Sequence, residues 1–154
     1  MINSNAELIA TFTWMGRLPA DEEIGVDPTT RYSADFGEQW AYQAGQPVAT
    51  AVLQAIRNLG AVVNTKSLQF DEHAWNFTFV LDRRSYLVFV QWIGREGRNN
   101  SFAMQAFFHE GCIASLFRSH KRDHELGAAC ELIRKALKSH PLVTDLEWVS
   151  EIPS

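Results

Sequence analysis

The sequence contains little cysteine, with only Cys112 and Cys130 among its 154 residues. Two cysteines are too few for the disulfide framework that stabilises many small secreted domains, and in a reducing compartment they would remain thiols. We therefore expect a fold that is stable without a disulfide bond.

The sequence also lacks a long uninterrupted apolar run. Its N-terminal stretch, MINSNAELIATFTWMGRLPADEE, has no basic cluster before the apolar residues, and Thr11, Thr13 and Gly16 interrupt the apolar part. These features argue against a secretory signal peptide and against a membrane-spanning helix. We expect a cytoplasmic protein without a membrane partner.

Apolar and aromatic residues, by contrast, are abundant. Apolar residues make up 46% of the chain and charged residues 21%, and there are ten Phe and five Trp. This composition suffices for one well-filled core, and the length is too short for two ordinary domains. We expect a single α+β domain over residues 1–154, in which residues 1–35 form an N-terminal apolar segment and an acidic loop.

Two regions have the apolar period of an α-helix. PVATAVLQAIRNLG begins with Pro47 and ends with Gly60, which suit the first and the capping position of a helix. Its predicted core stripe comprises Val48, Val52, Ile56 and Leu59. The preceding FGEQWAYQA predicts a shorter helix, which Gly45 and Pro47 would separate from the first. DHELGAACELIRKALKSH predicts the other main helix, with Asp123 as its N-cap.

Three segments between these helices are predicted β-strands. They are AWNFTFVL, which alternates between apolar and polar residues, YLVFVQWI and SFAMQAFFH, and short turns connect them. CIASLF and LVTDLEWVSEI can add further strands. The order of elements predicts the α+β class, with an antiparallel meander sheet of three to five strands packed against two main helices.

The middle strand, YLVFVQWI, is apolar on both faces. A loop of even length at DRRS pairs the inward residues of the first two strands, which are Phe79 with Val88, Phe77 with Val90 and Trp75 with Trp92. The opposite face then carries Leu87, Phe89 and Ile93, and is too apolar to remain in contact with water. We expect residues 6–15, or a second subunit, to cover it.

The segment FFHEGCIASLFRSHKRDHELG contains four potential zinc ligands, which are His109, Cys112, His120 and His124. Their spacing resembles two ligand pairs, but the gap between the pairs is shorter than in zinc fingers. On a helix extended back to Ser119, His120 and His124 would face solvent, whereas Cys112 adjoins an apolar run that favours burial. We expect solvated histidines rather than a metal site, and no cofactor.

The same segment permits a catalytic alternative, in which Cys112 is a nucleophile and His109 its base. A small enzyme or ligand-binding domain could use these residues and nearby arginines in a pocket between the sheet and the helices. No known signature surrounds Cys112, and no glycine-rich phosphate loop is present.

Basic residues near the aromatic strands raise a second alternative, nucleic-acid binding. Arg83 and Arg84 fall in one turn, and Arg95 and Arg98 in the turn at the other end of the central strand, so they do not form one patch. The isoelectric point of about 5.7 is also lower than is usual for such domains. We expect no nucleic-acid partner.

The stretch RYSADFGEQWAYQAGQPVATAVLQAIRNLG resembles segments of small bacteriophage proteins, in which a Tyr, a Trp and a Val/Ile helix ending in Leu-Gly follow an N-terminal apolar segment. The resemblance implies a bacterial or phage-borne protein and no particular activity. Because no catalytic set is assembled, we expect a non-enzymatic binding protein, such as an inhibitor or immunity protein, that contacts a protein partner or forms a homodimer. The candidate contact residues are Arg83, Arg84, Arg95, Arg98, Phe89 and Ile93.

Overall fold

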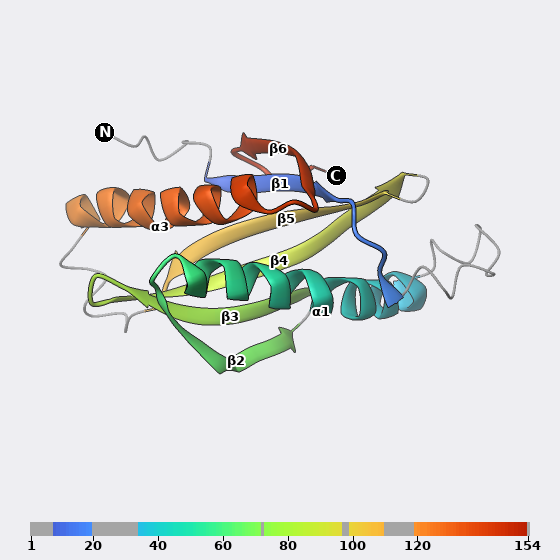
Figure 1. Ribbon diagram of the computed structural model, residues 1–154, viewed down its shortest axis with the longest axis horizontal. Helices are drawn as coiled ribbons and strands as arrows, with labels where there is room; N and C mark the ends of the chain where they lie inside the picture. Colours follow the sequence, from blue (N-terminus) through green and yellow to red (C-terminus); the bar gives the residue numbers. More distant parts are fainter. Residues whose placement is uncertain (1–7, 20–33, 72, 97–98, 110–118, 154) are drawn as a thin grey trace.

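The computed structural model describes residues 8–19, 34–71, 73–96, 99–109 and 119–153. In chain order its elements are β1 (Ile9–Trp14), α1 (Ala34–Asn58), β2 (Val62–Asp71), β3 (Ala74–Leu81), β4 (Arg84–Glu96), β5 (Asn99–Phe108), α3 (Ser119–Ser139) and β6 (Val143–Val149) (Figure 1). This architecture confirms the α+β class. The described sheet has six strands, however, rather than three to five.

The strand order in the sheet is β2-β3-β4-β5-β1-β6, and every pairing is antiparallel. The strands β3, β4 and β5 form the predicted meander, and β2 extends it by a strand that was not predicted. The N-terminal strand β1 lies between β5 and β6, so the expectation that residues 6–15 cover the second face of the sheet is wrong. Pairing on both sides gives the backbone of β1 hydrogen-bond partners, and its alternation places Ala10, Phe12 and Trp14 in the core.

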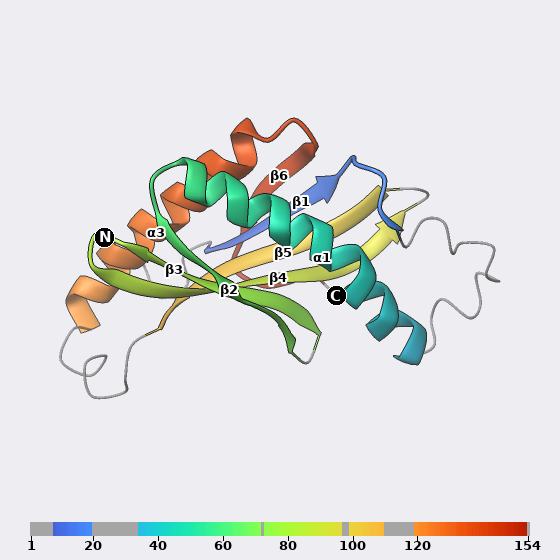
Figure 2. The same ribbon diagram turned by 60° about the horizontal axis from the view of Figure 1, so that its bottom comes forward.

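Both helices pack on the same face of the sheet (Figure 2). The helix α1 lies over β2, β3 and β4, and α3 lies over β5 and β6. The predicted core face is confirmed, because Trp75, Phe77, Phe79, Val88 and Val90 are buried and Trp92 is half-buried against this core. We call this side of the sheet the inward face and the other side the outward face.

The register between β3 and β4 differs from the prediction by two residues. Phe79 pairs with Tyr86, Phe77 with Val88 and Trp75 with Val90. Asp82 and Arg83 form a two-residue turn with positive φ angles of 49° and 68°, the conformation of a type I′ hairpin. Since the shift is even, every side chain stays on its predicted face.

The prediction of two helices separated at Gly45 and Pro47 is wrong, because α1 runs through both residues. Trp75 packs against the helix at this point, where a Cβ on Gly45 would lie 2.6 Å from Trp75 Cδ1. The Trp75 indole N–H also donates a hydrogen bond of 2.8 Å to the Tyr42 carbonyl. The Trp75 indole thus contacts α1 within the turn that precedes Pro47.

Two smaller expectations about the helices are also wrong. Leu59 is 45% exposed and not part of the core stripe, because α1 ends at Asn58 and the chain turns at Gly60 with a φ of 103°. The helix α3 begins at Ser119, so Asp123 lies inside the helix and is not its N-cap.

Gly45→Ala tests the contact with Trp75. Alanine favours a helix by about 1 kcal/mol over glycine, but overpacking against the indole costs about 1–3 kcal/mol, so we expect a net loss of stability in urea unfolding. In a Trp75→Leu background the same substitution should be neutral or stabilising. A stabilising effect of Gly45→Ala in the wild-type background would contradict the close contact.

His140 connects α3 to β6 through a contact that depends on its protonation. Its Nδ1 accepts a 3.2 Å hydrogen bond from the Leu142 backbone N–H, which requires an unprotonated Nδ1. Its ring lies 4.9 Å from that of Trp14, measured between centroids. Burial lowers the pKa of His140 below its usual value of 6.5.

We therefore expect acid to destabilise this junction. Because the folded-state pKa lies below the unfolded value, the unfolded chain binds more protons between the two, and stability falls as the pH drops below about 6.5. His140→Asn keeps a side-chain acceptor but does not titrate. Thermal unfolding from pH 7.5 to pH 5 should show a shallower decline for the variant, and parallel curves would show that His140 contributes no pH dependence.

Candidate functional site

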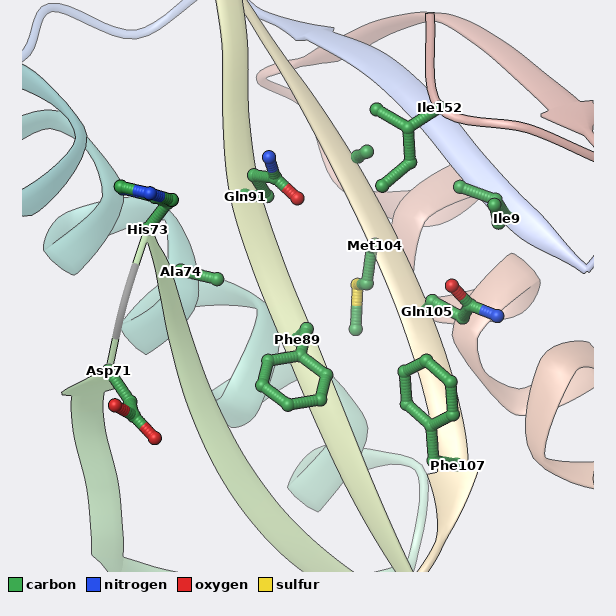
Figure 3. A pocket seen from close by; sticks show the side chains of 11 residues that line it. Ile9, Asp71, His73, Ala74, Phe89, Gln91, Met104, Gln105, Phe107 and Ile152 are labelled. Carbon is green, nitrogen blue, oxygen red and sulfur yellow. The ribbon is translucent and has the colours of Figure 1, made fainter. Parts of the chain in front are cut away.

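No described helix covers the outward face of the sheet, and this face contains a hollow of about 210 Å³ (Figure 3). The hollow lies over β3, β4 and β5 and extends to β1 and to the residues after β6. It is lined by Ile9, Asp71, His73, Ala74, Phe89, Gln91, Ala103, Met104, Gln105, Phe107 and Ile152.

Part of the lining belongs to one row of residues across the sheet, of which Asp71, Ala74, Gln91 and Ala103 line the hollow. Strand pairing places the residues of this row side by side in the order Asp71, Ala74, Gln91, Ala103, Thr11 and Glu147. An alanine on each side of Gln91 leaves space that larger side chains would fill. The row begins and ends with an exposed acidic residue.

Two phenylalanines form an apolar wall next to this row. Phe89 and Phe107 come from the neighbouring strands β4 and β5, and their rings meet edge to face with centroids 5.5 Å apart. Phe107 is 40% exposed and Phe89 is half-buried. Ile9 and Ile152 line another part of the hollow (Figure 3), so a ligand would meet apolar surface on more than one side.

The polar groups of the described lining are two amides and two titratable side chains. Gln91 and Gln105 offer neutral amides, which can donate and accept hydrogen bonds. Asp71 and His73 are the titratable residues of the lining, and both are exposed. The described residues of the lining include no Lys, Arg, Ser, Thr, Tyr or Cys, and among them there is therefore no hydroxyl or thiol nucleophile.

The structure brings one predicted contact residue into the hollow, which is Phe89. Ile93 is half-buried on the same strand and does not line it. Sequence reasoning missed Phe107, although the alternation of SFAMQAFFH already places it on one face with Ala103 and Gln105. It also missed Ala74 and Asp71, since their place in the hollow depends on the pairing of strands.

The predicted arginines do not gather in one place. Arg83 lies in the turn before β4, Arg84 begins that strand, and Arg95 lies near its other end, as expected. Arg98 lies outside the described residues. The Arg95 guanidinium stacks over the Trp40 ring at 4.9 Å from its centroid, so its place is on the inward side, away from the hollow.

The predicted zinc ligands fall partly outside the described residues, which do not include Cys112. His109 is exposed just after β5, where its backbone N–H donates to the Ser85 carbonyl at 2.9 Å, and it does not line the hollow. His120 and His124 belong to α3, but their side chains are not described. Among the described residues, no three His, Cys, Asp or Glu side chains are grouped to hold a metal ion.

Cys130 is the free cysteine in the described part of the chain. Its side chain is half-buried, and burial raises the pKa of its thiol to about 11. It is therefore a protonated packing residue at neutral pH and not a nucleophile.

Arg95 and Trp40 belong to a polar cluster at the end of the core. The buried Asn100 Oδ1 accepts hydrogen bonds from the indole N–H groups of Trp40, at 3.0 Å, and of Trp92, at 3.1 Å. The Asn100 Nδ2 is buried without a hydrogen-bond partner. One amide oxygen thus satisfies two indoles and fixes the junction of α1, β4 and β5.

We expect Asn100→Ala to lower the free energy of unfolding by about 2–3 kcal/mol, because two indole N–H groups lose their acceptor. Denaturant unfolding followed by tryptophan fluorescence measures the effect. Asn99→Ala, at the exposed neighbouring position, is the control and should change stability by less than about 0.5 kcal/mol. Equal effects of the two substitutions would refute the role of Asn100.

Comparison with known proteins finds no matching family model, no similar curated protein and no similar solved structure. Within the described residues, neither helix combines the length and the apolar character needed to cross a membrane. The function has to be inferred from the site itself.

Proposed function

We propose that this chain is a non-enzymatic binding protein that contacts a protein partner through the outward face of its sheet. The observation that carries the proposal is the hollow, whose apolar walls lie on a face without a described helix. An apolar surface that stays in contact with water is a common mark of a protein interface. The chemistry of the lining supports contact rather than catalysis.

The size of the hollow favours a side chain of a partner over a free small molecule. Pockets for drug-sized ligands have volumes of roughly 300–1,000 Å³, and the hollow has about 210 Å³. A single large side chain requires less space than a cofactor or an extended metabolite. The alternative of a small enzyme would also need His109 and Cys112, and His109 lies outside the hollow.

The edges of the sheet offer a poorer docking site than its face. The edge strand β2 has an irregular register between Asn64 and Gln69, where the Lys66 N–H bonds to the Asn64 side chain at 3.2 Å. The other edge strand, β6, carries Asp145 with a φ of 54°. Such irregularities and charges interrupt the continuous backbone template that an added strand needs.

The sequence supplies the finer part of the proposal. We propose a cytoplasmic protein of bacterial or phage origin that acts as an inhibitor or immunity protein. The absence of an assembled catalytic set in the sequence and the resemblance of residues 31–60 to small phage proteins support this class.

Phe107→Asp tests the proposed surface by placing a charge on the wall of the hollow. Capture of proteins from a lysate of the source organism, quantified by mass spectrometry, should show a stoichiometric partner whose recovery falls at least tenfold with the variant. Val62→Asp is the matched control, because Val62 is 71% exposed on β2 and does not line the hollow.

Circular dichroism should confirm that both variants fold. Equal recovery of the partner with wild type and Phe107→Asp would place the interface elsewhere. Sedimentation of the wild-type protein shows whether the partner is a second copy of the chain. Such a homodimer should dissociate with Phe107→Asp and not with Val62→Asp.

A further inference from the structure

We infer that the hollow receives a large apolar side chain from a partner segment that carries a Lys or Arg within three residues of it. This inference rests on the proposed function and specifies the chemistry of the partner. It follows from three properties of the hollow, which are its charge, its apolar wall and its amides.

Among the described residues that line the hollow, Asp71 is the acidic one and there is no Lys or Arg. Asp71 on β2 begins the row, and Glu147 on β6 ends it beyond the lining; both carboxylates are exposed. An anionic segment would therefore be repelled, whereas a cationic segment is complementary. Exposed charge pairs contribute little affinity, so the acids select the partner more than they hold it.

The apolar part of the hollow supplies the anchor point. Phe89 and Phe107 form one wall of the hollow, where an aliphatic or aromatic side chain can pack against them. Phe107 remains accessible to solvent, since this residue is 40% exposed. Burial of an apolar side chain here removes surface of both molecules from water.

The two glutamines complete the match to a peptide. Gln91 on β4 and Gln105 on β5 both line the hollow (Figure 3). Their uncharged amides can pair with main-chain N–H and C=O groups, which a peptide presents next to its side chains. A carboxylate or phosphate ligand would instead be expected to meet Arg or Lys.

The spacing of strands sets the separation between anchor and cation. Asp71 lies two strand spacings from Gln91 in the row, which is about 10 Å. Extended peptide spans roughly 3.3–3.6 Å per residue, so about three residues cover this distance. The flexible side-chain stem of Lys or Arg covers part of this distance, so fewer peptide residues are needed between the anchor and the cation.

Titration with capped tripeptides tests the inference without a known partner. The probes are Ac-Arg-Gly-Phe-NH2, Ac-Glu-Gly-Phe-NH2 and Ac-Arg-Gly-Ala-NH2, and the readout is the NMR shift of the side-chain amides of Gln91 and Gln105. We expect the arginine–phenylalanine probe to bind at least threefold more tightly than each of the other two. Equal affinities, or no shift at millimolar concentrations, would overturn the inference.

Two matched variants assign the charge preference to one carboxylate. Asp71→Asn should remove the preference of arginine over glutamate, whereas Asp82→Asn, which removes an exposed acid in the β3–β4 turn, should retain it. Persistence of the full preference in Asp71→Asn would show that this carboxylate does not select the ligand.

The failures of the inference and of the proposed function can be told apart. If Phe107→Asp releases a captured protein while the probes show no charge preference, the docking surface is correct and the ligand chemistry is wrong. If the probes show the preference but no protein depends on Phe107, the hollow binds such groups and the proposed function is wrong.

Discussion

Burial of the inward side chains of the sheet beneath α1 and α3 is the constraint on which the rest of the structure depends. Successive residues of a strand point to opposite faces, so placing Phe77 and Val88 inward also decides which residues face outward. Full burial of one such side chain contributes roughly 1.5–3 kcal/mol. Because one cluster contains many of them, a one-residue slip of a central strand is strongly disfavoured. Packing on the inward face thus holds the outward row, and the hollow, in register.

The parts of the fold that could be predicted from the sequence are those governed by local period. Alternation identified β3, β4 and β5 and the inward face of the first two. The exact pairing could not be predicted, because Asp82 and Arg83 adopt positive φ angles without glycine, a local cost that the gain in strand pairing outweighs. The continuity of α1 was also hidden, since the contact of Gly45 with Trp75 joins residues that are distant in sequence.

The candidate site was less accessible to sequence reasoning than the fold. The outward position of Phe89 follows from alternation along one strand. The hollow, however, combines residues of β3, β4 and β5 with Ile9 of β1, and β1 reaches β5 across most of the chain. No short stretch of the sequence predicts that β1 inserts beside β5. The same is true of the row from Asp71 to Glu147. Of the expected cover, residues 6–15, the described part instead forms β1, which extends the sheet, and no described helix covers this face.

The alanines of the outward face are better explained by the hollow than by the stability of the sheet. On the inward face, small residues such as Ala106 lie beneath a helix, where they leave room for its side chains. Ala74 and Ala103 have no described helix above them, and alanine is disfavoured in strands. A β-branched residue at either position would add contacts across the strands but would fill the space beside Gln91. The sheet therefore gives up local stabilisation at the two positions that flank Gln91 in the lining of the hollow.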